Sequence, residues 1–318
     1  MSKVDWPMLQ TLTLEGFFPT DADHWPAELL LSMFCRMPAL RRLVITAALT
    51  HYTATRCCML GSKPCAVTAL QRLRSITIAY PNPNDRVFSI PFPDLTHLAL
   101  RDWPRHYDIV AHKYYNRTFR SPILSATEAL SILRRLQAPV LATLELVYFA
   151  DEADDDLLAF IANAFPKLQH LQLHRYRSSS DETVDHRRIA RTLSAAQSLV
   201  SLRLNLDFQG DPGEHNPDLQ VSRDVLKAWC SQLSTFGWEI LSALELCASL
   251  KGVALLYRGE LPGMWAWYSR SRQATQECVY DRAPERRCAG SLPSLWALTD
   301  SLVIVTRFSR PAILMGHE

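Results

Sequence analysis

The stretch PKLQHLQL, from Pro166 to Leu173, places leucines three and then two residues apart behind a proline. In an extended chain alternate residues share a face, so two of its leucines would point one way and His170, Gln172 and His174 the other. Two histidines and a glutamine on one strand face raise the question of a metal or catalytic site. The leucines raise the question of a repeat.

The pattern P-x-L-x-x-L-x-L recurs along the chain. Copies begin at Pro7, Pro38, Pro93, Pro139 and Pro166, and two further copies without the proline begin at Leu73 and Leu199. Their first leucines stand at positions 9, 40, 73, 95, 141, 168 and 199, so neighbouring copies are 22 to 46 residues apart. A single match would be weak evidence, whereas seven matches predict an internal repeat. Degenerate copies are visible at 250–255 and 295–298.

Between the copies the apolar period changes from 2 to about 3.6, which predicts a helix in each interval. We expect helices over 26–37, 125–136, 154–165, 185–196 and 222–233. Ser125 and Glu128 have capping-box spacing, and the acidic residues at 154–156 suit the start of a helix dipole. Prolines 38, 139 and 166 would end three of these helices, because proline cannot continue one. The unit is helix, proline, short strand and loop.

This unit resembles the leucine-rich repeat, L-x-x-L-x-L-x-x-N/C-x-L, over roughly residues 6–210. The usual Asn/Cys position holds Phe17, Trp103, Phe149 and Tyr176, which we expect to pack as an aromatic spine under the loops. The resemblance implies an α/β leucine-rich-repeat solenoid, with a curved parallel sheet on the concave face and helices on the convex face.

Two regions follow from this interpretation. Residues 1–260 would form the solenoid, with irregular repeats and an insertion at about 101–122, and residues 261–318 would form a C-terminal capping segment and tail. MWAWYSRSR, at 264–272, is interpreted as a terminal strand that covers the end of the solenoid. The tail at 307–318 has no evident structural purpose.

If the leucines point inward, the residues between them form three outward rows. The first row would be Thr11, Arg42, Ser75, His97, Thr143, His170 and Ser201. The second would be Thr13, Val44, Thr77, Ala99, Glu145, Gln172 and Arg203, and the third Glu15, Thr46, Ala79, Arg101, Val147, His174 and Asn205. A partner is expected on this concave face. The candidate partner-binding residues are Arg42, His97, Arg101, Glu145, His170, Gln172, His174, Arg203 and Asn205.

Metal and catalytic sites are not expected. His170 and His174 would lie about 13 Å apart along a strand, too far to share one ion. Motifs such as G-x-S-x-G, G-x-x-x-x-G-K-[ST] and H-E-x-x-H are missing from the sequence. We therefore expect no catalytic residue, no cofactor and no metal. The alternative is an enzyme whose site lies in the insertion at 101–121, which holds His106, Tyr107, Asp108, His112 and Tyr114.

Composition limits the partners and the compartment. The 318 residues are 48% hydrophobic and 21% charged, and 34 Lys and Arg against 32 Asp and Glu give a net charge of +2. This balance favours neither nucleic acid nor membrane as a partner. The N-terminus lacks the pattern of a secretory signal, and the 8 cysteines are scattered, so we expect free thiols and a cytoplasmic or nuclear protein.

Repeats of the FPxLxxLxL type, together with the late stretch SLKGVALLYRGELPGMWAWYSRS at 249–271, are similar to the repeat regions of fungal F-box-like proteins. In that family an F-box bundle docks the adaptor of a cullin-RING ubiquitin ligase, and the repeats present the substrate. The sequence opens at Trp6 within a repeat strand, without an F-box. The chain would then be a fragment or a divergent protein that lost its F-box.

The expected function is a non-enzymatic protein-protein interaction scaffold. A narrower version is the substrate-recognition part of an SCF-type ubiquitin ligase, which would bind the ligase adaptor only if an F-box exists upstream. A non-functional truncated gene product is a further alternative, left open by the sequence.

Overall fold

The computed structural model describes residues 5–17, 27–50, 56, 58–59, 70–111, 119–212, 222–257, 264–270, 279–282 and 301–306. Its strands are β1 (Thr11–Phe17), β2 (Arg42–Thr50), β3 (Ser75–Ala79), β4 (His97–Arg101), β5 (Phe119–Arg120), β6 (Leu124–Ser125), β7 (Thr143–Phe149), β8 (His170–Tyr176), β9 (Ser201–Asn205), β10 (Gly252–Tyr257), β11 (Met264–Ser269), β12 (Val279–Arg282) and β13 (Ser301–Thr306). Its helices are α1 (Ala27–Cys35), η1 (Arg86–Ser89, a 3₁₀-helix), α3 (His106–Ala111), α5 (Ala126–Arg135), α6 (Asp154–Ala164), α7 (His186–Leu193) and α8 (Arg223–Ala243).

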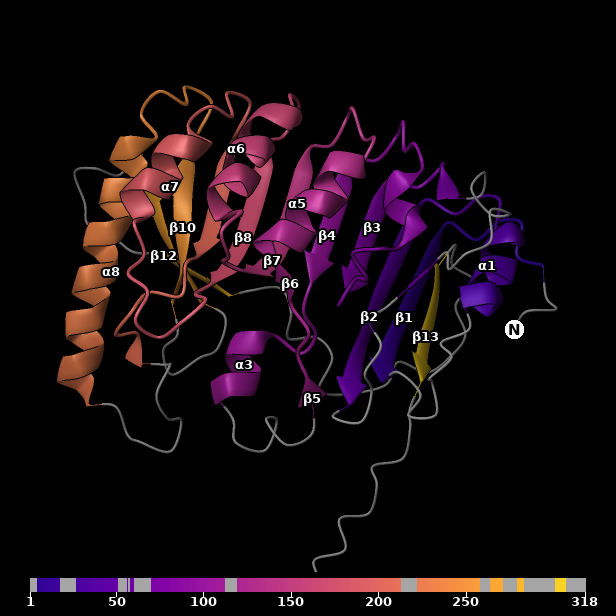
Figure 1. Cartoon of the computed structure of the whole chain (residues 1–318), viewed down its shortest axis with the longest axis horizontal. Coiled ribbons are helices and arrows are strands. Elements are labelled where there is room, and N and C mark those ends of the chain that lie inside the picture. The colour runs from indigo at the N-terminus through magenta and orange to yellow at the C-terminus, as the bar shows by residue number, and fades with distance from the viewer. Residues whose placement is uncertain are drawn as a thin grey trace, which may run out of the picture.

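One long sheet runs through the molecule, in the order β12-β11-β10-β9-β8-β7-β4-β3-β2-β1-β13. All neighbours from β10 through β1 to β13 are parallel, whereas the β10–β11 and β11–β12 pairs are antiparallel. Helices α1, α5, α6 and α7 lie in a row over one face (Figure 1), and α5–α6, α6–α7 and α7–α8 are in contact. The expected mixed α/β fold with a mainly parallel sheet is confirmed. We call the helix-covered side the helix face and the other side the open face.

Leucine rungs fill the space between the sheet and the helices. Leu144, Leu171 and Leu202 stand side by side in register on β7, β8 and β9, and none is more than 2% exposed. Burial of one such side chain contributes about 1.5–3 kcal/mol. Because the same positions recur in each copy, the rungs form one continuous core along the sheet.

Each repeat begins with a β-turn, which explains the spacing of proline and leucine. The Leu168 N–H donates to the Phe165 carbonyl at 3.0 Å, so Pro166 is the second residue of a four-residue turn. Proline suits that position because its fixed φ matches the turn and its missing N–H is not needed. The same hydrogen bond, at 3.0–3.3 Å, closes the turns that end at Leu9, Leu40, Leu73, Leu95, Leu141, Leu199 and Leu250. The proline thus shapes the turn as well as ending a helix.

Shared carbonyl groups tie neighbouring repeats together where the strands begin. The Ala142 carbonyl accepts hydrogen bonds from the N–H groups of Gln169 and His170, at 2.8 and 2.9 Å. The carbonyls that accept two N–H groups of the next repeat in this way are those of Gln10, Arg41, Arg74, Thr96, Ala142 and Gln169. This ladder satisfies backbone groups that a row of unrelated turns would leave unpaired. The edge at which the strands begin is called the strand-start edge, and the opposite one the strand-end edge.

The expected helices are present, with two differences. α5 begins with the predicted capping box, in which the Ser125 hydroxyl accepts from the Glu128 N–H and the Glu128 carboxylate accepts from the Ser125 N–H. α8, by contrast, continues to Ala243, ten residues beyond its expected end at 233. The sequence also gave no sign of α3, which forms within the insertion.

Both ends of the sheet are built from the last part of the described chain. β10 is the degenerate copy at 250–255, and β11 pairs with it as the expected covering strand. β12 lies outside β11, so β11 is not the last strand at that end. At the other end β13 pairs with β1 in parallel, a pairing that the sequence did not predict. The degenerate copy at 295–298 and the tail at 307–318 fall outside the described residues.

Two remaining expectations concern thiols and membrane segments. Cys35, Cys58, Cys230 and Cys247 are free thiols, and the other cysteines fall outside the described residues. In the part of the chain that the structure describes, no helix combines the length and the apolar character needed to cross a membrane.

Candidate functional site

The predicted outward rows are in register across the sheet. Arg42 pairs with Ser75, Ser75 with His97, and the row continues through Thr143 and His170 to Ser201. The second row likewise joins Glu145 to Gln172 and Gln172 to Arg203. The leucine period therefore fixed which residues share the open face and which of them are neighbours.

Accessibility divides this face into two halves. None of the first-row residues is buried, and Arg42 and His170 are exposed. The His170 ring lies 2.8 Å from the Ser201 hydroxyl through its Nδ1 atom. In the second row Glu145, Gln172 and Arg203 are half-buried, as is Arg101 in the third. These residues form an accessible polar strip along the strand-start half of the open face.

The expectation that the third row is available to a partner is wrong for His174 and Asn205, which are 1% and 4% exposed. The His174 ring stacks on Tyr107 of α3, with ring centroids 6.1 Å apart, and meets Trp265 of β11 edge-on at 5.7 Å. Tyr107 and Trp265 belong to a second small hydrophobic cluster on the open face. The chain itself therefore covers the strand-end half of this face.

Arg105 anchors the first part of the insertion on the sheet. Its side chain is only 2% exposed and donates to the Asp102 carboxylate at 3.0 Å and to the Glu145 carboxylate at 2.7 Å. Asp102 also accepts the N–H of His106 at 2.5 Å, which fixes the first turn of α3. The sequence did not single out Arg105 or Asp102, and only their i, i+3 spacing could have suggested a pair.

Glu145 stands at the centre of this charge cluster. Burial alone would raise the pKa of its carboxyl group, but Arg105 and Arg101 outweigh burial and lower the pKa to about 2. Glu145 is therefore ionised and held by two guanidinium groups, with Arg101 Nε at 3.5 Å. Glu145, Gln172 and Arg203 are neighbours in register, but each side chain has another partner. Gln172 contacts the His174 ring at 2.9 Å, and Arg203 lies over Trp265.

His97 lies beside this cluster in the first row. Burial lowers the pKa of its imidazole, and the nearby Glu145 carboxylate opposes that shift without cancelling it. His97 is therefore neutral at pH 7, and it offers a partner a hydrogen-bonding ring without a charge.

Two of the groups that the enzyme alternative would need, His106 and Tyr107, pack against side chains of the sheet. His106 packs edge-on against Tyr176 and Phe149, with ring centroids 4.7 and 5.4 Å apart, and its Nδ1 atom is 3.2 Å from the Ser121 hydroxyl. Phe149 and Tyr176 are themselves in contact at 5.7 Å, as expected for neighbours in an aromatic spine. Asp108 lies on α3, whereas His112 and Tyr114 fall outside the described residues.

Tyr80, which follows β3, contacts the same segment through its hydroxyl group. It has a positive φ of 50° and is almost fully buried, and its hydroxyl donates to the Pro104 carbonyl at 3.3 Å. Burial, aided by the Asp102 carboxylate, raises the pKa of this hydroxyl above its ordinary range, so Tyr80 is a neutral donor rather than an acid–base group.

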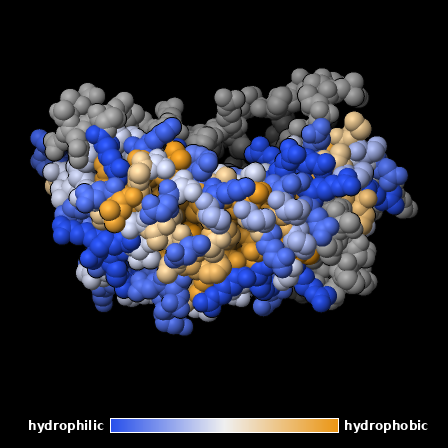
Figure 2. Space-filling model, turned by 90° about the horizontal axis from the view of Figure 1, so that it is seen from above, coloured by the Kyte–Doolittle hydropathy of each residue, from blue (hydrophilic) through white to orange (hydrophobic). Residues whose placement is uncertain are grey.

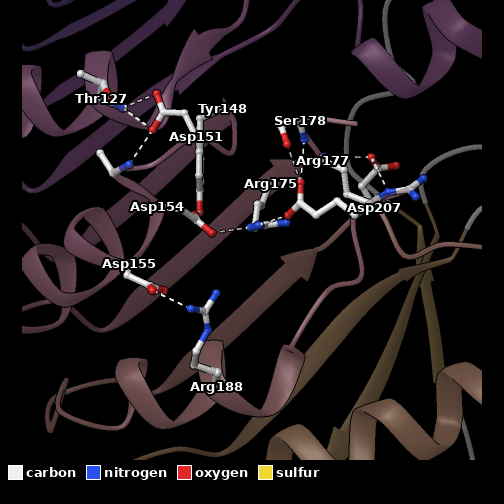
Figure 3. A network of polar contacts seen from close by, with 12 residues as sticks. Thr127, Tyr148, Asp151, Asp154, Asp155, Arg175, Arg177, Ser178, Arg188 and Asp207 are labelled. Atoms are coloured by element: carbon white, nitrogen blue, oxygen red, sulfur yellow. Dashed lines mark hydrogen bonds and ion pairs between the residues drawn. The ribbon is translucent and has the colours of Figure 1, made fainter. Parts of the chain in front are cut away.

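A second polar cluster lies on the helix face at the strand-end edge (Figure 3). The Asp154 carboxylate accepts from the Tyr148 hydroxyl at 3.0 Å and from Arg175 Nε at 2.8 Å. Arg175 also donates to Glu182, whose carboxylate accepts from the backbone N–H and the hydroxyl of Ser178. These bonds order the polar stretch after β8, which joins β8 to α7. Within the described ranges, no group of three or more His, Cys, Asp and Glu side chains is placed to hold a metal ion.

Compared with known proteins, the sequence matches no protein-family model and no curated protein. Among solved structures it is similar to the leucine-rich repeat-containing protein LegL7 from Legionella pneumophila, at 16% sequence identity and a TM-score of 0.39. The alignment covers 74% of this chain and 71% of that protein. A likeness at this level adds nothing about function.

Proposed function

We propose that the chain is a non-enzymatic scaffold, a leucine-rich-repeat solenoid that binds a partner protein on the accessible polar strip of its open face. The observation that carries the proposal is the first outward row, which crosses seven adjacent strands from Thr11 to Ser201 without a buried residue. Parallel sheets are usually covered on both faces. A strip of polar side chains that the described chain leaves accessible is therefore a surface available to a partner.

The candidate residues within reach of this partner are Arg42, His97, Arg101, Glu145, His170, Gln172 and Arg203. Arg42 and His170 are the exposed members of this set. Glu145 pairs with both Arg101 and Arg105, so Glu145 and Arg101 would shape the floor of the strip rather than reach a partner. Hydrogen bonds from rows of side chains on a rigid sheet favour a specific partner over an unspecific one.

Site-directed photo-cross-linking in the cells that make the protein tests this proposal. A photo-reactive residue is placed at His170 on the open face or, as a control, at Gln232, which is exposed on α8. We expect cross-linked species at position 170 that do not form at position 232. The substitution Arg42→Glu should reduce their yield. The same species at both positions, or none at position 170, would contradict the proposal.

We further propose that the partner is a ubiquitin-ligase substrate, as the resemblance to fungal F-box-like proteins implies. Purification of the longest natural product of the gene tests this narrower version. We expect the ligase adaptor and a cullin to co-purify with it. If the open-face cross-links form but neither ligase component co-purifies, the scaffold stands and the ligase role is wrong.

A further inference from the structure

The two edges of the sheet differ in charge. The turns and first strand residues at 7–11, 38–42, 71–75, 93–97, 139–143, 166–170, 197–201 and 248–252 carry the cations Arg41, Arg42, Arg72, Arg74, Lys167 and Lys251, and one carboxylate, Asp94. The strand-end edge carries charges of both signs, which pair with one another as Arg105–Asp102, Arg175–Asp154, Arg177–Asp207 and Arg188–Asp155. A chain of net charge +2 therefore concentrates positive charge along its strand-start edge.

Several of these cations are exposed and have no counter-ion in the described chain. Arg74, Lys167 and Lys251 are exposed, and none of their charged groups forms an ion pair or a hydrogen bond with another described residue. Cations in the last turn of a helix, such as Arg134 and Arg135 of α5, complement the helix dipole. Lys167 lies in a β-turn and Arg74 directly follows one, both outside any helix, so that explanation does not account for them.

An apolar hollow opens on the same edge. It has a volume of about 580 Å³ and is lined by Gln71, Pro91, Pro93, Leu136, Gln137, Ala138, Pro139, Ala164 and Phe165. The lining comes from the turns before β3, β4 and β7, from the residues that follow α5 and from the end of α6. Its floor is fixed, because the Phe92 N–H donates to the Gln137 carbonyl at 2.8 Å and Pro91 bridges to Gln137.

Charge and hollow are adjacent. Arg74 lies three positions after the lining residue Gln71, and Lys167 lies two positions after the lining residue Phe165, so each cation comes from a segment that also contributes to the hollow. Figure 2, which looks onto this edge, shows hydrophobic surface near the middle of the molecule with hydrophilic residues around it. The size lies within the roughly 300–1,000 Å³ typical of ligand pockets, enough for a few side chains.

We propose that this hollow and its basic border bind an acidic peptide segment of a partner protein, with apolar side chains in the hollow and carboxylates on Arg74 and Lys167. Single-stranded nucleic acid fits less well, because such ligands stack on exposed aromatic rings and the only ring in the lining, Phe165, is 7% exposed. None of the residues that line the hollow belongs to the open-face strip, so the proposal does not depend on the proposed function.

Fluorescence anisotropy with labelled peptides tests the proposal on the full chain. The probes are a peptide of alternating Glu and Leu, a Lys–Leu peptide and a Glu–Ser peptide of the same length, and an oligothymidine. We expect the Glu–Leu peptide to bind most tightly. Its affinity should fall as salt shortens the screening length from about 30 Å at 0.01 M to about 3 Å at 1 M.

Two variants separate charge from shape. Arg74→Glu combined with Lys167→Glu should lower the affinity for the Glu–Leu peptide about tenfold, because two attractive charge pairs become repulsive. Ala164→Gln fills the hollow at an exposed helix end and should reduce binding of Glu–Leu to the level of Glu–Ser. Arg223→Glu is the matched control, since Arg223 is exposed at the start of α8, on the strand-end edge.

Three results would overturn the proposal. They are equal binding of the Glu–Leu and Lys–Leu peptides, unchanged binding in the double charge reversal, and tighter binding of oligothymidine than of Glu–Leu. Loss of open-face cross-links in the Ala164→Gln variant would show that the two surfaces are one site, which would also contradict it. Thermal unfolding followed by circular dichroism checks that each variant is as stable as the unmodified protein before binding is compared.

Discussion

Neighbouring carboxylates in this protein differ in burial and in their partners, and Asp154 and Asp155 show this difference most clearly. Both stand in the first turn of α6, so both interact equally well with the helix dipole. Asp154 is 6% exposed and binds Tyr148 and Arg175, whereas the Asp155 side chain is 56% exposed and meets only Arg188. A difference in unfolding free energy between substitutions at these two positions therefore reflects their burial and pairing.

Asp154→Ala should cost about 1–3 kcal/mol of unfolding free energy, because it leaves the buried Tyr148 hydroxyl and Arg175 Nε without their acceptor, while Arg175 keeps Glu182 as a counter-ion. Asp155→Ala should cost at most about 1 kcal/mol, as exposed pairs usually do. Urea unfolding of both variants, with the slope of the transition compared as a check on the mechanism, measures this. Equal losses in the two variants would mean that the buried pair is no stronger than the surface one.

At the scale of elements, the leucine period was enough to predict the strands of the seven repeat copies and the rows of the open face, whereas β5, β6, β12 and β13 lie outside it. Each copy carries its own turn and strand, so local sequence determines local structure there. The burial of His174 could not be predicted in this way, because the groups that cover it, Tyr107 and Trp265, come from segments far away in the sequence. A contact between side chains so far apart in the sequence does not change the repeat pattern, so the pattern cannot predict it.

α8 was expected to end near residue 233 and instead runs to Ala243. Gly237, in the middle of its second half, weakens the helix pattern because glycine costs about 1 kcal/mol there relative to alanine. The structure gives a reason for the glycine. A Cβ at position 237 would lie 2.4–2.5 Å from the ring of Tyr268, which is itself only 2% exposed.

Gly237→Ala should therefore destabilise the protein, by about 1–3 kcal/mol, although helix propensity alone would predict a gain. Gln232→Ala, at an exposed position of the same helix, is the control and should be neutral or slightly stabilising. Thermal unfolding followed by circular dichroism measures both. A gain in stability in Gly237→Ala would show that α8 does not pack on β11 as closely as this contact requires.

At the scale of the whole molecule, a long sheet must protect its two outer strands, because unpaired edges recruit other chains. One end is closed by antiparallel strands β11 and β12, which cannot continue the parallel repeat. At the other end β13 covers β1 from Thr11 to Gly16. The same C-terminal part of the chain thus completes both ends, and neither end depends on a repeat of its own.

Removal of residues 301–318 should uncover the edge of β1, whereas removal of 307–318 alone should not. In a parallel pair each strand uses alternate N–H groups towards each neighbour. The β1 amides that face β13 should therefore lose protection from hydrogen exchange in the longer deletion, while those that face β2 keep it. The exposed edge should also cause self-association that grows with concentration, visible by sedimentation velocity. If β1 exchanges equally in both deletions, β13 does not close this end of the sheet in solution, and another element or a partner must do so.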